Sequence, residues 1–347
     1  MAVNRRDGIE LGVAAFFVVA AGVAHYADVK PVLAFAVAAV AIAILARLVG
    51  GATEQLGARV GSSAAGVVQS ALGNLPELFI SFFALRAGLT TVVQSALVGS
   101  VIANSVLVLG LAFIVGGARN GTQRFDSPRA RTIATLAMLA AAILSVPTFA
   151  HAFHAPAEAH ARTLSLICAG VLLVLFFLTL PAFLSGGEEG SGRARWTLPT
   201  TIVVLGAAGA CAALVSDWFV DALKPATEAL GMSEAFAGLV VVAIAGNAVE
   251  NVVGVQLAAA NRPDFAISVI VNSALQVALF LTPVLVFLSL FMSTELTLVF
   301  PTLLAISLLL AAGISALVVY DGESTWEEGS ILVGLYVVIA ASFWWGA

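Results

Sequence analysis

Long apolar runs, separated by short polar breaks, account for most of the sequence. A helix needs about 20 mainly apolar residues to cross a bilayer. Eleven stretches approach or exceed that length, at about residues 9–27, 31–57, 62–86, 89–116, 130–150, 162–184, 198–220, 234–260, 264–291, 296–319 and 328–346. The breaks between them carry loop signals such as Asp28-Val29-Lys30-Pro31 and Asp321-Gly322-Glu323-Ser324. The pattern predicts an all-α polytopic membrane protein with about eleven transmembrane helices.

Composition agrees with this pattern. The chain has 347 residues, of which 61% are hydrophobic and 10% charged, whereas soluble domains carry about 25% charged residues. Arg5 and Arg6 precede the first apolar run, which is long and has no clear cleavage site, so we interpret it as a retained helix. Cys168 and Cys211 lie inside apolar runs and imply neither a disulfide framework nor a zinc site.

A five-residue pattern occurs twice, each time near the middle of a predicted span. Gly73-Asn74-Leu75-Pro76-Glu77 is followed, 173 residues later, by Gly246-Asn247-Ala248-Val249-Glu250. At the same offset Ser95 matches Ser268 and Ser100 matches Ser273, with no gap. Internal repeats of this kind are typical of secondary transporters.

The repeat divides the chain. We predict an extra N-terminal helix over 1–28, a first five-helix repeat over 29–184, a cytoplasmic linker over 185–197 and a second five-helix repeat over 198–347. Because five is odd, the second repeat enters the membrane from the opposite side. The fold class expected is therefore one helix plus two inverted five-helix repeats.

Basic residues predict the orientation. With a cytoplasmic N-terminus, ten lysines and arginines fall in cytoplasmic segments and four, Lys30, Arg86, Arg162 and Lys224, in external ones. This asymmetry favours a cytoplasmic N-terminus in a plasma (inner) membrane. The segment from Arg119 to Arg131 then indicates an anchor near anionic lipid and not a nucleic-acid patch.

Glu77 and Glu250 are the main candidates for function. A carboxylate at mid-membrane depth costs about 3 kcal/mol on insertion scales, so it usually marks a functional site. Pro76 should kink or open its helix, and irregular backbone at that depth is tolerated only in protein or around a cavity. Carbonyls freed by the break could bind a cation. The alternative is that each glutamate is a lone acid satisfied by neighbouring helices.

Other polar residues follow each glutamate and suggest the ion. They are Gln94, Ser95, Ser100 and Asn104 in the first repeat, and Ser268, Asn272, Ser273 and Gln276 in the second. Two carboxylates with neutral oxygens suit a hard divalent cation, above all calcium. The absence of Cys and His from this set disfavours a soft transition metal. Serine and asparagine can also simply join helices inside membranes, and that alternative stays open.

These residues carry a resemblance to a known family. Residues 73–78 and 97–110, with Thr53-Glu54-Gln55-Leu56 before them, resemble the first repeat of the calcium/proton exchangers, and residues 246–250 and 272–280 resemble the second. The resemblance implies one plus five plus five helices and ion-binding acids at Glu77 and Glu250. It also implies that five polar residues lie near the bound ion, namely Asn74, Asn247, Ser100, Ser273 and Gln276. The resemblance further favours a proton-coupling role for Glu54.

The chain departs from the family pattern at three positions. Asn251 stands where members usually have His, and Asn272 where they usually have Gly. Pro76 is more typical of the sodium/calcium branch. These differences bear on ion preference and leave the expected fold unchanged.

The hypothesis favoured by these observations is a secondary antiporter that exchanges calcium for protons. Two carboxylates in a poorly hydrated site repel each other, and either one calcium ion or two protons would neutralise them. The neutralised states could cross and the empty one could not, which makes exchange obligatory. Calcium and protons are thus transported substrates, and no cofactor is expected.

Three other functions are compatible with parts of the sequence. A sodium-coupled or sodium/proton cation exchanger on the same fold is the main alternative. A membrane enzyme lacks support, because no nucleophile–base pair lies near Glu77 or Glu250, and a channel fits broken inverted repeats less well. One predicted external loop contains His151, His154, Glu158 and His160. The loop could bind a metal ion or sense pH, and the alternative is an ordinary solvated loop.

Overall fold

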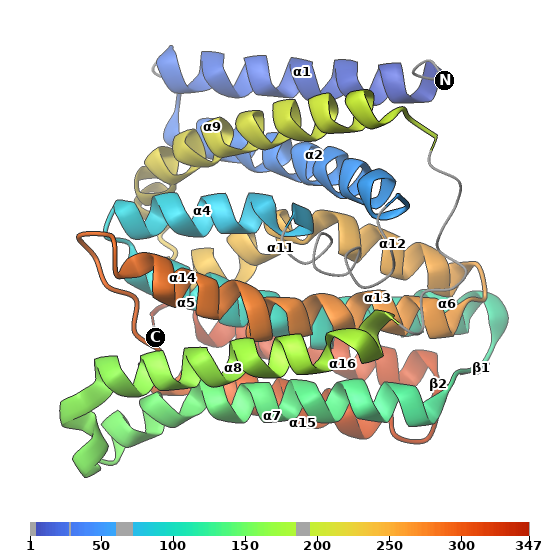
Figure 1. Ribbon diagram of the computed structural model, residues 1–347, viewed down its shortest axis with the longest axis vertical. Coiled ribbons are helices and arrows are strands. Elements are labelled where there is room, and N and C mark those ends of the chain that lie inside the picture. Colours follow the sequence, from blue (N-terminus) through green and yellow to red (C-terminus); the bar gives the residue numbers. More distant parts are fainter. Residues whose placement is uncertain (1–4, 28, 60–71, 185–194, 347) are drawn as a thin grey trace. The chain divides into compact units, whose positions relative to one another are not determined.

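The computed structural model describes residues 5–27, 29–59, 72–184 and 195–346 (Figure 1). Within these residues, seven helices are long and apolar enough to cross a membrane, and an eighth span is added if one bent pair is counted. Thr302–Val318 is a shorter apolar helix. The prediction of an all-α polytopic membrane protein is confirmed.

The elements of the N-terminal half, through α8, are almost all helical. They are α1 (Arg5–Tyr26), α2 (Pro31–Gly57), α4 (Leu75–Arg86), α5 (Thr90–Ile102), the π-helix η1 (Ala103–Val108), α6 (Leu109–Asn120), β1 (Gln123–Arg124), α7 (Ser127–Ala152), the 3-10 helix η2 (Pro156–His160) and α8 (Ala161–Leu184).

The C-terminal half begins at α9. Its elements are α9 (Leu198–Leu230), α10 (Glu234–Phe236), the π-helix η3 (Ala237–Val242), α11 (Ala243–Gly246), α12 (Ala248–Ala259), α13 (Pro263–Gln276), the π-helix η4 (Val277–Leu281), α14 (Thr282–Ser289), α15 (Thr302–Val318), β2 (Glu323–Ser324) and α16 (Trp326–Ser342). β1 and β2 pair in an antiparallel manner, with Gln123 opposite Ser324 and Arg124 opposite Glu323.

Each of the eleven predicted spans overlaps one helix or a helical series among the described residues, although residues 296–301 of span 296–319 are not helical and α9 continues to Leu230, beyond span 198–220. Span 89–116 is α5, η1 and α6, span 234–260 runs from α10 to α12, and span 264–291 is α13, η4 and α14. For span 62–86, the part before Leu72 lies outside the described residues. The hydropathy pattern therefore located the apolar helices correctly.

The repeat inferred from the sequence reappears in the helix boundaries. Moved by 173 residues, α4 coincides with α12 at both ends, and the first residues of α5 and α6 coincide with those of α13 and α14. The π-helical segments η1 and η4 also overlap at this offset, and the last residue of α2 matches that of α9. Two stretches of different sequence thus fold into the same series of elements.

The helix starts follow ordinary capping chemistry. The hydroxyl of Thr197 accepts from the backbone N–H of Thr200 at the start of α9. Thr325 and Glu328 form a reciprocal capping box at the start of α16. These contacts satisfy backbone donors that a helix terminus leaves without partners.

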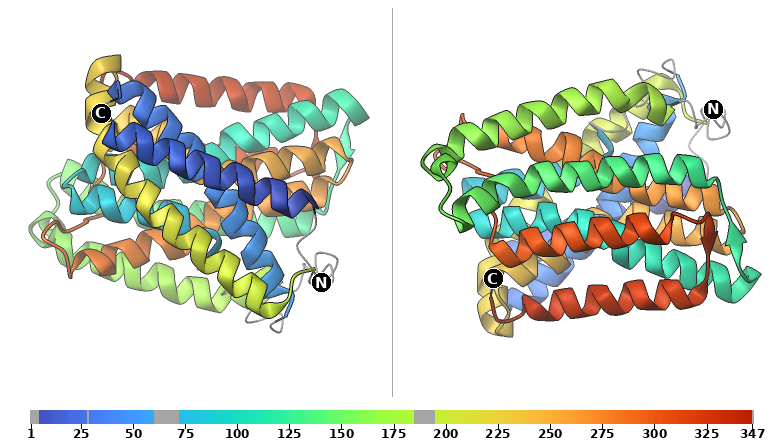
Figure 2. Two further views of the ribbon diagram at one scale, coloured as in Figure 1. Left: turned by 90° about the horizontal axis from the view of Figure 1, so that it is seen from above. Right: turned by 90° about the horizontal axis from the view of Figure 1, so that it is seen from below.

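The chain forms two compact units, which we describe separately. Unit 1 comprises Met1–Gly88, Leu175–Gly231 and Ala245–Val249. Within it α2 packs along α9, and α1 lies across both, as Figure 2 (left) shows. Gly22 permits this approach, because a methyl group added there would lie 3.0 Å from the Trp218 ring.

Unit 2 comprises Leu89–Val174, Met232–Ile244 and Glu250–Ala347. Within it α15 packs on α7 and α16 on α6 (Figure 2, right). α5 crosses η3 closely, since a methyl group on Gly99 would lie 2.5 Å from the Leu239 carbonyl oxygen. The absence of a side chain at Gly99 therefore allows this close packing.

The two compact units do not follow the two sequence repeats. Unit 1 takes α2, α4 and the end of α8 from the first repeat together with α9 and residues 245–249 from the second, and unit 2 takes the rest of both. Each unit therefore contains segments of both repeats, although α4 belongs to unit 1 and nearly all of its repeat equivalent α12 to unit 2. Residues about 170 positions apart become neighbours inside a single unit, as Glu77 and Asn247 do.

Candidate ion-binding site

The first break in unit 1 positions Glu77. Asn74 is a turn residue that precedes α4, and its carbonyl oxygen accepts from the Leu78 N–H at 2.9 Å. Pro76 lies in the first turn of α4, where its missing N–H breaks no helical hydrogen bond. Glu77 occupies the same turn, where the helix dipole favours a negative charge.

Glu77 is held by a residue from the other repeat. Its side chain is only 7% exposed. The Asn247 side-chain amide donates to Glu77 Oε1 at 2.6 Å, a short distance that is typical of a hydrogen bond to a carboxylate. The predicted site residues Asn74, Glu77 and Asn247 are therefore all buried in unit 1, and two of them are in direct contact.

Gly246 makes this contact sterically possible. A methyl group built on Gly246 would lie 2.5 Å from Glu77 Cγ and 3.2 Å from Oε1. The side chain of Glu77 therefore packs directly against the backbone at the second break. The repeated Gly-Asn pair supplies, in its second copy, both the space for Glu77 and the donor that binds it.

The second break bends the chain. Asn247 is a turn residue between α11 and α12, and the helical arms Glu234–Gly246 and Glu250–Ala259 differ in direction by 63°. Glu250 lies in the first turn of α12, at the position that Glu77 has in α4, and it is partly exposed. Backbone breaks were expected at both glutamates, and both are confirmed.

In unit 2 a second pair of residues joins the two repeats. Asn104, in η1, donates its side-chain amide to Ser273 Oγ at 3.2 Å and to the Ser100 carbonyl oxygen at 3.1 Å. Ser100 and Ser273 are buried, while Gln276 is partly buried as the last residue of α13. The sequence marked all four residues as polar candidates but did not predict the Asn104–Ser273 contact.

The rest of the predicted polar set has other partners. Gln94 donates to the carbonyl oxygens of Thr297 and Val299, both at 2.9 Å, and so holds the extended connection before α15. Ser95 lies against Gly238 at the crossing of α5 with η3. Ser268 accepts from Asn272 at 3.2 Å and from Arg129 at 3.4 Å.

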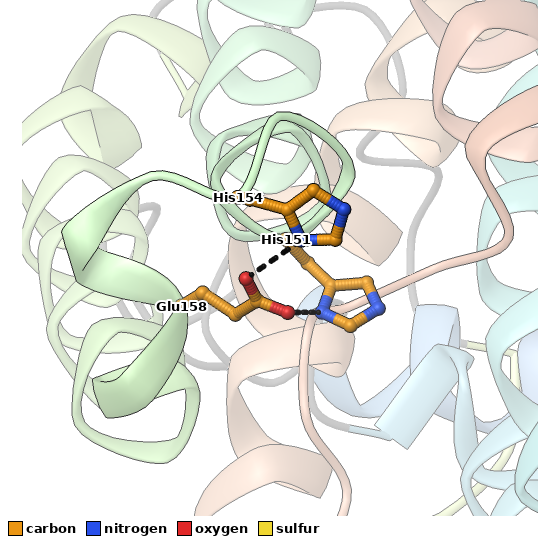
Figure 3. Close-up of polar contacts among 3 residues, drawn as sticks. All are labelled: His151, His154 and Glu158. Atoms are coloured by element: carbon orange, nitrogen blue, oxygen red, sulfur yellow. Dashed lines mark hydrogen bonds and ion pairs between the residues drawn. The ribbon is translucent and has the colours of Figure 1, made fainter.

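Two further candidates lie away from these contacts. Glu54 is exposed near the C-terminal end of α2. His151 and His154 both approach Glu158, with Nδ1–Oε distances of 2.9 and 3.1 Å (Figure 3). Across the described ranges, no three His, Cys, Asp or Glu side chains form a group that could hold a metal ion. The three side chains in Figure 3 form a polar surface cluster.

Comparison with known proteins places this geometry among transporters. The model of the family described as "Sodium/calcium exchanger protein" matches residues 30–185 and 200–345. A "Ca(2+)/H(+) antiporter" of Aphanothece halophytica is 34% identical over 92% of this chain and 92% of its own length. A "Ca(2+)/H(+) antiporter ChaA" of Bacillus subtilis (strain 168) is 33% identical over 89% and 91%.

The fold also matches a solved structure. The protein titled "Structure of native YfkE" superposes with a TM-score of 0.84 and is 32% identical, covering 96% of this chain and 99% of that one. The superposition covers both repeats and extends into the helix that precedes them. The architecture of the whole chain is therefore that of a known polytopic transporter.

Proposed function

Because the chain belongs to the sodium/calcium exchanger family, and within it to the calcium/proton exchangers, we propose that it is a secondary antiporter exchanging calcium for protons. The observation that carries the proposal is the 2.6 Å hydrogen bond between Asn247 and Glu77. It joins the two repeated Gly-Asn-x-x-Glu segments at a buried carboxylate. The relatives are named as antiporters, which supports a transporter over an enzyme.

The ion-binding residues we assign are Glu77 and Glu250, with Asn74, Asn247, Ser100, Ser273 and Gln276. Their donors are carboxylate, amide and hydroxyl oxygens, which suit calcium. Calcium and protons would compete for the same two carboxylates, since each form of loading removes their negative charge. Glu54, exposed at the end of α2, is the further proton-coupling candidate.

Alternating access follows from this electrostatics. An empty pair of charged carboxylates in a poorly hydrated environment is costly, whereas the calcium-loaded and doubly protonated states are neutral. Only neutral states would allow the broken helices to rearrange around the ion, as in other repeat-based antiporters. The alternative of sodium-coupled exchange would require sodium to replace the two protons.

A binding measurement tests the proposal. We expect the affinity of the purified protein for calcium to rise with pH and then to level off, because protons leave the two carboxylates as pH increases. Isothermal titration from mildly acid to alkaline pH in sodium-free buffer would measure this. An affinity independent of pH would contradict competition at the carboxylates.

We also propose the orientation and the organisation expected from the sequence. The N-terminus would be cytoplasmic in a plasma (inner) membrane, with repeats over 29–184 and 198–347 joined by a cytoplasmic linker over 185–197. Most of that linker lies outside the described residues. Cysteines introduced at Arg119 and Arg131 should resist impermeant labels in intact cells, and labelling from outside would reverse the orientation.

A further inference from the structure

The C-terminal end of α12 is closed by a regular helix cap. Asn261 follows the helix in a left-handed conformation, with a φ of 58°. Its backbone N–H donates to the Ala258 carbonyl oxygen at 3.0 Å, and the Arg262 N–H donates to the Leu257 carbonyl oxygen at 3.0 Å. This pair of bonds is a Schellman motif. Because a carbonyl oxygen can accept two hydrogen bonds, Ala258 can accept from a second donor.

Gln123 supplies that second donor from another part of the chain. It lies in β1, and its side chain is only 3% exposed. Its amide nitrogen donates to the Ala258 carbonyl oxygen at 3.0 Å and to Asn261 Oδ1 at 2.9 Å. Asn120 Nδ2 lies farther away, at 3.3 Å from the Ala258 oxygen and 3.4 Å from the Ala259 oxygen. We therefore assign the cap of α12 mainly to Gln123.

Gly116 in α6 leaves the space that the Gln123 amide occupies. A methyl group built on Gly116 would clash with Gln123 Oε1 and would lie 2.9 Å from Cδ. It would also lie 3.3 Å from Ala258 Cβ. The amide is thus packed between the backbone of α6 and the end of α12, so packing as well as hydrogen bonding determines its position.

The segment that carries Gln123 is tied to other connections of unit 2. β1 pairs with β2 between α15 and α16 (Figure 1). The Phe125 N–H donates to the Gly322 carbonyl oxygen at 2.9 Å, and the Asp126 N–H donates to Asp264 Oδ1, at the start of α13, at 2.6 Å. The α6–α7, α12–α13 and α15–α16 connections therefore form one hydrogen-bonded network, which holds Gln123 in place.

The rest of α12 is held on one side only. Gly254 faces α13, because a methyl group there would lie 2.5 Å from Ile270 Cγ1, whereas Val252 and Val253 are exposed. At its N-terminal end the helix follows a turn, and a turn allows the direction of a helix to change. The contact with Gln123 is therefore the one that fixes the far end of α12.

A helix transmits a displacement of one end to the other. Glu250 lies in the first turn of α12 and Ala258 in the last, eight residues apart, which is about 12 Å along the helix axis. A tilt or rotation of the helix at Ala258 therefore moves the Glu250 side chain. Calcium binding is sensitive to such movement, because its ligand oxygens lie within a narrow range of about 2.3–2.6 Å.

We propose that Gln123 is a positioning residue for calcium binding, because it caps the C-terminal end of α12 and so fixes the place of Glu250. The inference rests on the proposed function. A proton needs only one oxygen of a carboxylate, whereas calcium needs six to eight oxygens arranged around it. Loss of the cap should therefore weaken calcium binding more than proton binding.

Two substitutions disturb the cap in different ways. Gln123→Met keeps the approximate length of the side chain and removes both donors. Gly116→Ala keeps the amide but displaces it, because the added methyl group clashes with Gln123 Oε1. We expect each variant to lower calcium affinity about three- to tenfold, within the range for residues that act at a distance. Isothermal titration at fixed alkaline pH in sodium-free buffer measures the affinity and the number of sites, which should not change.

Gln94→Met is the matched control. Gln94 is also buried, and its amide nitrogen donates to the carbonyl oxygens of Thr297 and Val299, both at 2.9 Å. Each methionine variant removes two hydrogen bonds of a buried amide, so the two should lose similar thermal stability. Only Gln123→Met should lower calcium affinity, since Gln94 holds the segment before α15 and not α12.

The pH profile separates positioning from general damage. In Gln123→Met, calcium affinity should fall by the same factor at each pH from mildly acid to alkaline, so the midpoint of the pH dependence should not move. Fewer binding sites at unchanged affinity would indicate structural damage and would overturn the inference. Affinity within about twofold of the unmodified protein in both cap variants, or an equal loss in Gln94→Met, would also overturn it and leave the proposed function intact. An unmodified protein that binds no calcium would overturn the function itself.

Discussion

The two copies of the Gly-Asn-x-x-Glu segment have the same backbone role and different surroundings. In each, asparagine forms the turn and glutamate occupies the first turn of a twelve-residue helix, α4 or α12. Glu77 is buried and bound by Asn247, whereas Glu250 is partly exposed and is followed by Asn251, whose buried side-chain oxygen has no hydrogen-bond partner among the described residues. Pro76 stands in the first copy where Val249 stands in the second.

The difference indicates that Glu77 and Glu250 have different roles, although they occupy equivalent positions in the two repeats. Glu77 is oriented in advance by a donor and by the packing of Gly246 against its side chain, and such prior orientation reduces the cost of binding an ion. Glu250 is partly exposed. Sequence identity of the two motifs therefore does not make the two acids equivalent in energy.

The largest expected effect comes from removing either acid. Glu77→Gln and Glu250→Gln should each abolish calcium transport in folded protein, because each removes one of the two charges that a calcium ion neutralises. The double variant should be no worse, since residues acting as one unit are not additive. Glu158→Gln, in the surface cluster, is the control; substantial transport by either single variant would contradict a shared site.

Asn247→Ala should have the next largest effect, because it removes the amide that donates to Glu77. Hydrogen bonds to charged groups contribute about 1.5–3 kcal/mol, so calcium affinity should fall by at least about tenfold. Titration calorimetry would measure this. Asn120→Ala removes another amide donor, one that binds the Gly116 carbonyl oxygen at 3.2 Å, and equal losses in the two variants would argue against a specific contact.

Gly246→Ala tests the packing of the Glu77 side chain against Gly246. The added methyl group would lie 2.5 Å from Glu77 Cγ, so the side chain must shift, and we expect affinity to fall several-fold, by about 1 kcal/mol or more. Gly206→Ala has open space around the added methyl group and should leave binding unchanged. Normal binding by Gly246→Ala would mean that the position of Glu77 is not restrained in this way.

Glu54→Gln should have the smallest effect on calcium binding. Its side chain is exposed, so we expect affinity to change by less than about twofold. If Glu54 passes protons, the transport rate should instead change its dependence on pH. Rates measured in proteoliposomes across a pH series would show this, and an unchanged profile would remove Glu54 from the proton pathway.

The sequence was sufficient to predict the features of the fold that depend on local sequence, such as helix positions and helix breaks. Apolar length located the helices, and the offset of 173 residues predicted the matching boundaries of α4 and α12. Glycine, asparagine and proline at mid-span indicated the two breaks, but the sequence did not predict the two contacts that join the repeats, Asn247 to Glu77 and Asn104 to Ser273.

Side-chain partners supplied by distant backbone could not be inferred in the same way. Gln94 has the appearance of a site residue, yet it binds two carbonyl oxygens of the extended segment before α15. Ser95 is equivalent to Ser268 in sequence, but one lies at a helix crossing and the other accepts from Arg129. Asn251 was notable only as a departure from the family pattern, because burial of its oxygen depends on tertiary packing that the sequence does not show.

Calcium flux in sodium-free proteoliposomes tests the central claim most directly. With purified protein as the only transporter and a proton gradient imposed across the vesicle membrane, calcium should accumulate on the more acidic side as protons leave, and collapse of the gradient with a protonophore should stop it. Calcium movement that ignores the proton gradient, or that begins only when sodium is added, would contradict calcium/proton exchange.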